Sequence, residues 1–119
     1  MEFKTLIAYQ KAKELYKLIN DDIVATLTDR IIKDQLKRAS LSIVLNIAEG
    51  TSRLSKADQR HFFVTGRGSV YECYVIVDLI DFPDSEVHKS VQMRLEEVSK
   101  MLYSLIKRRS SPDTAVKPV

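Results

Sequence analysis

SIVLNIAEG, residues 42–50, interrupts an apolar pattern of helical spacing with small and polar side chains, and RLS at 53–55 and GRGS at 66–69 continue this character. Ordinary packing of aliphatic side chains between helices does not require such residues. Glycine inside a helix costs about 1 kcal/mol relative to alanine, so Gly66 and Gly68 need a compensating gain. We expect that gain to be a close approach of two helix backbones.

The apolar residues around this stretch recur every three or four positions, and glycine and proline are scarce, with three of each in 119 residues. This spacing is typical of long amphipathic helices. We predict a first helix over about residues 5–26 and a second that follows a cap at Thr28 or Asp29 and ends near Gly50. Ser55 caps a third. Residues 81–85, Asp-Phe-Pro-Asp-Ser, stop it and offer two candidate caps for a fourth. Such helices with short connections predict an all-α, up-down-up-down antiparallel four-helix bundle.

Each predicted helix has an apolar stripe that we expect to face the core. The stripes contain Leu6, Tyr9, Lys13, Tyr16, Ile19, Ile23 and Leu27; then Ile32, Leu36, Ala39, Ile43 and Ile47; then Phe62, Gly66, Val70, Cys73, Val77 and Ile80; and finally Val87, Val91, Leu95, Val98, Leu102 and Leu105. Residues 20–22, Asn-Asp-Asp, are a weak point of the first helix because their side chains compete for backbone hydrogen bonds.

The second and third helices are expected to form a hairpin that turns near residues 52 and 53. This turn would pair Ala39 with Gly66, Ser42 with Phe62 and Phe63, Asn46 with Gln59, and Glu49 with Lys56. It would also bring Arg38 to Arg67, either to grip a phosphate or to be neutralised by Asp34 and Glu72.

Asn46 and Glu49 lie near an apolar face, and if buried they need hydrogen-bond partners, for which Arg53, Lys56 and Ser69 are candidates. A salt bridge or cap is favoured for Glu49 over a role as a general acid, because no second catalytic group is placed against it. We therefore interpret six residues as a structural signature of the fold: Asn46, Glu49, Gly50, Gly66, Gly68 and Ser69.

The length, 119 residues with 45% hydrophobic, is typical of one domain with a single core. We assign residues 1–109 to the bundle and expect the polar, proline-bearing residues 110–119 to be a disordered tail. No signal peptide or spanning segment is evident, which predicts a soluble cytoplasmic protein without a membrane partner. The lone Cys73 excludes an intramolecular disulfide and fits a reducing compartment.

The formal net charge of +3 is unevenly distributed. Residues 30–67 hold 8 basic and 3 acidic groups, residues 72–97 hold 2 and 7, and residues 98–119 hold 5 and 1. This pattern is typical of a surface for nucleic acid or an acidic partner, and equally of helices that neutralise one another.

Catalytic and metal-binding patterns are weak. His61 and His88 are the only two histidines, and no acidic cluster has ligand spacing, so we expect neither a metal site nor a cofactor. Ser104 and Lys107 match S-x-x-K without its companion motifs, and Gly66-x-Gly68 follows no strand. We predict no catalytic residue and no enzymatic activity.

Several segments together resemble a known family: Phe3-Lys-x-Leu6, Gln10-Lys-Ala12 with Leu15, Gln35-Leu-Lys-Arg-Ala39, Ser42-Ile43, Asn46-Ile-Ala-Glu-Gly50, Arg53-x-Ser55, and Gly68-Ser69 with Glu72. In order and spacing, over roughly residues 3–108, the chain resembles the four-helix-bundle proteins encoded in intervening sequences of bacterial 23S rRNA genes. The resemblance implies a homo-oligomer, with five subunits in known relatives, and no established catalysis. A related branch, the accessory variability protein of diversity-generating retroelements, works with a reverse transcriptase and nucleic acid through a basic surface.

The leading hypothesis is therefore a non-enzymatic homopentameric module for RNA or DNA, with a nucleic-acid enzyme as a further possible partner. The alternative is a protein-protein scaffold with no nucleic-acid role. The resemblance implies a basic surface that this chain would build from Lys33, Lys37, Arg38, Arg53, Lys56, Arg60 and Arg67, assisted by Lys107, Arg108 and Arg109.

Overall fold

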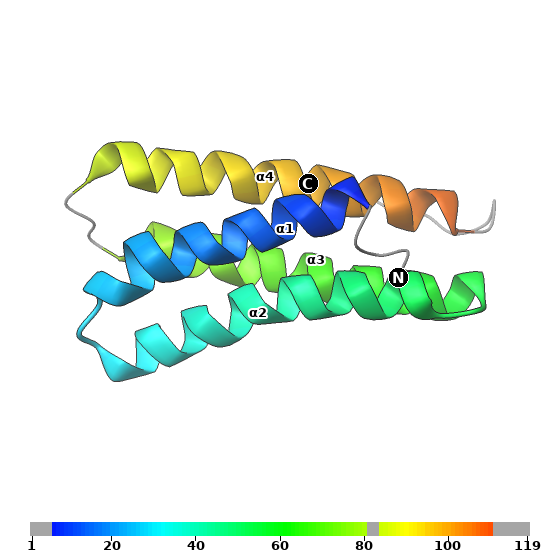
Figure 1. Cartoon of the computed structure of the whole chain (residues 1–119), viewed down its shortest axis with the longest axis horizontal. Helices are drawn as coiled ribbons and strands as arrows, with labels where there is room; N and C mark the ends of the chain where they lie inside the picture. Colours follow the sequence, from blue (N-terminus) through cyan, green and yellow to red (C-terminus); the bar gives the residue numbers. More distant parts are fainter. Residues whose placement is uncertain (1–5, 81–83, 111–119) are drawn as a thin grey trace.

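All four predicted helices are present in the computed structural model, which describes residues 6–80 and 84–110 (Figure 1). They are α1 (Ile7–Leu18), α2 (Arg30–Ser52), α3 (Lys56–Leu79) and α4 (Ser85–Arg108). Consecutive helices run antiparallel, and contacts join α1 to α2, α2 to α3, α3 to α4, and α4 back to α1. The predicted up-down-up-down four-helix bundle is thereby confirmed.

Side-chain caps fix the starts of three helices, because the first backbone N–H groups of a helix have no partner within it. The Asp29 carboxylate accepts from the amides of Ile31 and Ile32 at 3.0 and 3.1 Å. The Ser55 hydroxyl accepts from the amide of Asp58 at 3.1 Å. Asp84 caps α4 in the same manner. Each cap was predicted, and Asp29 serves in preference to Thr28.

The predicted weak point of the first helix becomes a change of helix type. After α1 the chain continues as a π-helical segment, η2 (Ile19–Ile23), and a 3₁₀ turn, η3 (Val24–Thr26). The Asn20 amide donates to the Tyr16 carbonyl at 2.7 Å and to the Ser40 hydroxyl of α2 at 3.2 Å. The side chain thus binds a carbonyl of its own helix and also ties that helix to α2.

Within residues 6–80 and 84–110, twenty apolar side chains form the buried core, and the predicted stripes of the second and fourth helices supply many of them. The first stripe was right in part: Ile19 and Ile23 are buried, but Lys13 is exposed, and Ala8, Ala12 and Leu15 are the buried residues of α1. Alanine contributes little apolar surface, so the larger neighbours dominated the spacing pattern. In α3 the buried ring belongs to Phe63, and Phe62 is only half-buried.

The predicted register of the α2–α3 hairpin was wrong. Ser42 meets Ser69, hydroxyl to hydroxyl at 2.7 Å, which is six positions beyond the predicted Phe63. A β-carbon on Gly66 would lie nearest to Asn46 and Ile43 of α2, and not to the predicted Ala39. The cause is that α2 continues past Gly50 to Ser52, so the connection at residues 53–55 is centred later than the predicted turn.

A short polar network occupies the α2–α3 contact. The Asn46 amide donates to the carbonyl and the hydroxyl of Ser42, at 2.8 and 3.0 Å. Ser69 donates to the Thr65 carbonyl at 3.3 Å and shares a hydrogen bond with Ser42. Asn46 therefore finds its partners on its own helix, and the predicted partners Arg53 and Lys56 are not needed.

The three glycines have different environments. A side-chain carbon on Gly50 would lie 2.6 Å from the buried Phe63 ring, and one on Gly66 would lie 3.2 Å from Asn46 Cβ. Both therefore permit the close helix approach that we expected. At Gly68 no described atom outside its own helix backbone and neighbouring residues lies within 4 Å of that position, so the expectation fails there.

Cys73 of α3 is fully buried. Desolvation, with a smaller contribution from Glu72, raises the pKa of its thiol from 9.0 to about 12. Thiolate is the reactive form, so the native protein should resist thiol-modifying reagents at pH 8 and react only on unfolding. Timed labelling with and without denaturant checks this, and rapid native labelling would contradict it. The raised pKa of Cys73 also contributes to the free energy of unfolding. This contribution is fully present below pH 9 and is lost as the pH rises toward 12.

Among the described helices, none has the length and apolar character that a bilayer crossing needs. Residues 111–119 of the predicted tail lie outside the described residues. The predicted start of the first helix at residue 5 and residues 81–83 of the predicted stop after the third helix also lie outside them. Ser110 is described, and its hydroxyl donates to the Ile106 carbonyl at 2.9 Å.

Candidate nucleic-acid interface

The turn between α2 and α3 and the C-terminal end of α4 lie at the same end of the bundle, at the right in Figure 1. Six of the ten predicted nucleic-acid-binding residues gather there, and we call them the basic end: Arg53, Lys56, Arg60, Lys107, Arg108 and Arg109. The antiparallel topology explains this gathering, since it brings together residues about fifty positions apart.

Arg53 is held at the turn by three contacts. Its guanidinium bonds the Glu49 carboxylate at 2.9 Å and lies over the Phe62 ring, 4.6 Å from the centroid. Its backbone carbonyl accepts from the Gln59 amide at 2.8 Å. Glu49 was predicted to form a salt bridge, and Arg53 was a predicted partner, so this pair is confirmed. Because the carboxylate is half exposed, the ion pair orients Arg53 more than it stabilises the fold.

Arg109 and Arg60 connect the end of α4 to α3. Arg109 Nε donates to Gln59 Oε1 at 2.8 Å, and its guanidinium lies 4.9 Å from the Phe63 ring centroid. Arg60 Nε donates to the Ser110 hydroxyl at 3.0 Å. Desolvation, with a smaller effect of Arg108, lowers the pKa of Arg109, although a guanidinium stays charged at any physiological pH. Sequence reasoning missed Gln59, which bridges the turn and α4.

Most of the charge at the basic end has no opposing carboxylate among the described residues. Of the acidic side chains in residues 6–80 and 84–110, Glu49 alone forms an ion pair with a member of the basic end. With Glu49 and Asp58 as its local acids, the basic end has six cations and a net charge of +4. Lys56, Lys107 and Arg108 are exposed to solvent. Such a surface attracts phosphates.

The other four predicted residues lie elsewhere. Lys33, Lys37 and Arg38 are on the N-terminal half of α2, and the fifteen residues from Arg38 to Arg53 span about 22 Å at 1.5 Å each. Arg67 faces α4, where its Nε donates to the Ser99 hydroxyl at 3.4 Å beside the rings of Tyr71 and Tyr103. The shifted register therefore does not bring Arg38 to Arg67, and the proposed phosphate grip between them was wrong.

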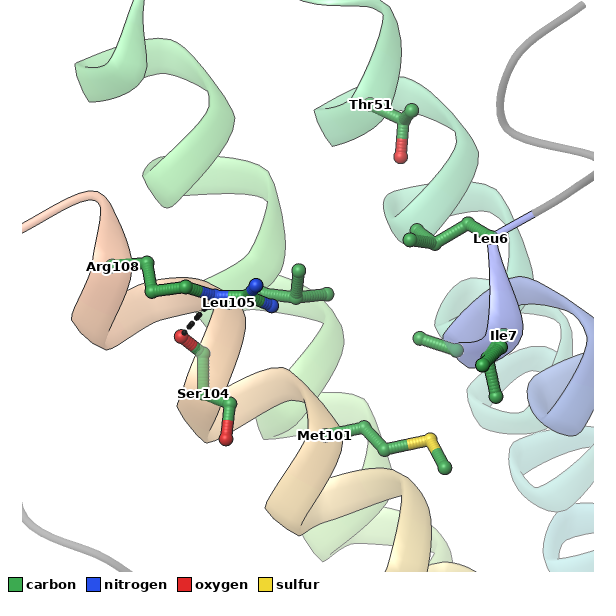
Figure 2. A pocket seen from close by; sticks show the side chains of 8 residues that line it. Leu6, Ile7, Thr51, Met101, Ser104, Leu105 and Arg108 are labelled. Atoms are coloured by element: carbon green, nitrogen blue, oxygen red, sulfur yellow. Dashed lines mark hydrogen bonds between the residues drawn. The ribbon is translucent and has the colours of Figure 1, made fainter.

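A pocket of about 630 Å³ opens beside the basic end, between the start of α1, the last turn of α2 and α4 (Figure 2). Leu6, Ile7, Met101 and Leu105 give it apolar walls, and Arg108 lies at its edge with Nε donating to the Ser104 carbonyl at 3.4 Å. No sequence pattern indicated it, because its residues come from three separate helices. Its polar side chains, Thr51, Ser104 and Arg108, form no nucleophile-base pair.

Metal-binding geometry is also missing from the part of the chain that the structure describes, where no group of three or more His, Cys, Asp or Glu side chains converges. His88 instead contacts the Val77 carbonyl at 2.8 Å. The arrangement at the basic end offers cations, guanidinium planes and apolar contact surface, which suit phosphate and base contacts.

The fold defines a class: all-helical, antiparallel four-helix-bundle proteins. Within this class, the chain belongs to the 23S rRNA-intervening sequence protein family, whose family model matches residues 4–104. A crystal structure of a protein of unknown function from the S23 ribosomal protein family of Bacteroides thetaiotaomicron is similar, with a TM-score of 0.77 and 22% identity. The match covers 85% of this chain and 99% of that one, and it supports the fold. No curated protein matches the chain.

Proposed function

We propose that this protein is a non-enzymatic, homo-oligomeric module that binds single-stranded or structured RNA, or DNA, through its basic end in the cytoplasm. The observation that carries the proposal is the gathering of six cations at one end of the bundle, with one ion pair between them and the described acids. Affinity for a polyanion comes mainly from neutralised phosphates and released counterions.

The side chains at the basic end support two kinds of contact with a nucleic acid, one through exposed cations and one through a guanidinium held in place. Lys56, Lys107 and Arg108 are exposed and suit phosphate oxygens. Arg53 is held over the Phe62 ring by its contact with Glu49, so its guanidinium is positioned before any ligand arrives. Holding it in advance reduces the entropy lost on binding. These contacts read no base sequence, so we expect weak sequence preference.

Self-association would multiply a modest surface. A single basic end supplies few phosphate contacts, whereas an assembly of five, as the family resemblance implies, would repeat it five times on one strand. Linked contacts raise the effective concentration at each further site, which increases both affinity and its dependence on salt. The proposal includes a nucleic-acid enzyme as a partner on the same strand.

Titration of a fluorescent single-stranded RNA with the full-length protein at 50 mM salt tests the proposal. We expect micromolar or tighter binding that weakens steeply as salt increases, at the rate expected for several phosphate contacts. Absent binding, or binding that does not respond to salt, would overturn the nucleic-acid role and favour a protein scaffold.

A further inference from the structure

The outward face of α3 is apolar, although the helix already buries its opposite face in the core. Phe63, Gly66, Val70, Cys73 and Val77 are buried. The stripe that points away from them comprises Val64, Gly68, Tyr71, Val75 and Leu79, spaced three or four residues apart and all exposed. A helix that is apolar on both sides is typical of one buried on both sides.

Exposed apolar side chains concentrate on this part of the molecule. Of the ten large ones in the described residues, seven lie on α2 and α3, whereas α1 and α4 have one each. Ile31, Ile32 and Gln35 of α2 and Tyr71, Val75 and Ile76 of α3 border a groove of about 430 Å³, with Glu72 at its edge. We call the five-residue stripe of α3 together with Ile31 the outer face.

Gly68 gives the outer face an independent feature. Apart from the neighbouring residues and backbone of its own helix, no described atom lies within 4 Å of the position a β-carbon would occupy, so packing among the described residues does not require a glycine. Glycine costs about 1 kcal/mol in a helix relative to alanine. At the middle of an exposed apolar stripe, its absent side chain leaves room for another helix to approach the backbone of α3 closely.

We infer that the outer face is the contact that joins this subunit to a second copy of the same chain, packed across Gly68. This inference rests on the self-association in the proposed function and names the surface responsible. No residue of the stripe is charged, and apolar, charge-depleted surfaces are typical of permanent homo-oligomer contacts. The basic end, by contrast, offers the cations that a nucleic acid needs.

The size of the surface fits this assignment. α3 has 24 residues, about 36 Å at 1.5 Å per residue, and two adjacent helices are about 20 Å wide, which gives roughly 700 Å². Stable protein interfaces bury about 600–1,000 Å² on each partner. The outward face of α2 and α3 is therefore large enough for one subunit contact.

The test compares two substitutions of equal chemistry by sedimentation at about 50 µM, with helicity from circular dichroism as the folding check. Val75→Glu places a carboxylate on the outer face, and Met93→Glu does the same at an exposed position of α4. We expect the wild type and Met93→Glu to sediment as the same oligomer of the 13.6 kDa chain, and Val75→Glu to dissociate at least tenfold more readily.

Gly68→Leu provides a second variant, because leucine favours helix and its β-carbon would have open space beyond its own helix. It should keep its helicity and weaken the assembly as Val75→Glu does. If both outer-face variants retain the wild-type mass, the inference is overturned while self-association stands. A monomeric wild type would overturn both, and RNA binding by that monomer would still support the nucleic-acid role.

Discussion

Gly50→Val is expected to lower the free energy of unfolding by about 3 kcal/mol, the upper part of the range for overpacked cores. The cause is steric, because the new side chain would start 2.6 Å from Cε1 and 2.8 Å from Cδ1 of Phe63. The Phe63 ring is fully buried and lies beneath the Arg109 guanidinium, so it has little room to move. Urea unfolding followed by circular dichroism measures the change.

A graded series and a double mutant isolate this cause. Gly50→Ala should cost less, about 1 kcal/mol, because alanine adds one carbon and recovers some helix propensity. Phe63→Leu alone removes ring volume, and in combination with Gly50→Val it should recover at least about 1 kcal/mol of the loss expected from adding the two single effects. Strict additivity would show that Gly50 is not paired with Phe63.

Reversing two charges at the basic end, Lys56→Glu with Lys107→Glu, is expected to reduce RNA affinity by at least about 100-fold at 50 mM salt. Both side chains are exposed and belong to no ion pair among the described residues, so the fold should remain intact. Each reversal removes a phosphate contact and adds a repelling carboxylate. Fluorescence anisotropy with labelled RNA gives the affinities.

The chain offers a control with the same change of net charge. Lys13 and Lys17 are exposed on α1, away from the α2–α3 turn. Lys13→Glu with Lys17→Glu should reduce affinity far less, since charges beyond about 10 Å are largely screened at moderate salt. Equal losses in the two double variants would indicate attraction by overall charge, and the basic end would have no special role.

Local features of the fold were predictable because they depend on neighbouring residues. The caps Asp29, Ser55 and Asp84 satisfy amides two or three positions away, and the Asn-Asp-Asp run marked the π-helical segment. The apolar stripes of α2 and α4 were also clear from spacing. These signals are sufficient for the number and direction of the helices and for the starts of α2, α3 and α4.

Features that depend on three-dimensional fit were not predictable in the same way. The buried alanines of α1 contribute little apolar signal. The α2–α3 register depends on where the connection between the helices lies, and the extension of α2 to Ser52 places it later than the predicted turn. Gly50 looked like a helix end because glycine often ends helices, yet it lies within α2 and makes space for a ring.

The candidate site was predictable in part. The cations around the α2–α3 turn and at the end of α4 do gather, because antiparallel topology brings these segments to one end. Lys33, Lys37 and Arg38 were grouped with them because the family resemblance implies a basic surface, and that resemblance does not say which end of the bundle each cation occupies. The outer face of α3 was hidden because its residues share a helix with the core stripe, and only the structure separates the two faces.

The dependence of RNA affinity on salt tests the central claim, that phosphates bind at the basic end, most directly. Affinities of the wild type and of Lys56→Ala with Lys107→Ala are measured between 50 and 200 mM salt. The account predicts a steep linear fall in log affinity against log salt for the wild type, and a slope shallower by about two for each engaged subunit of the variant. Equal slopes for the two proteins, or a wild-type affinity that does not change with salt, would contradict it.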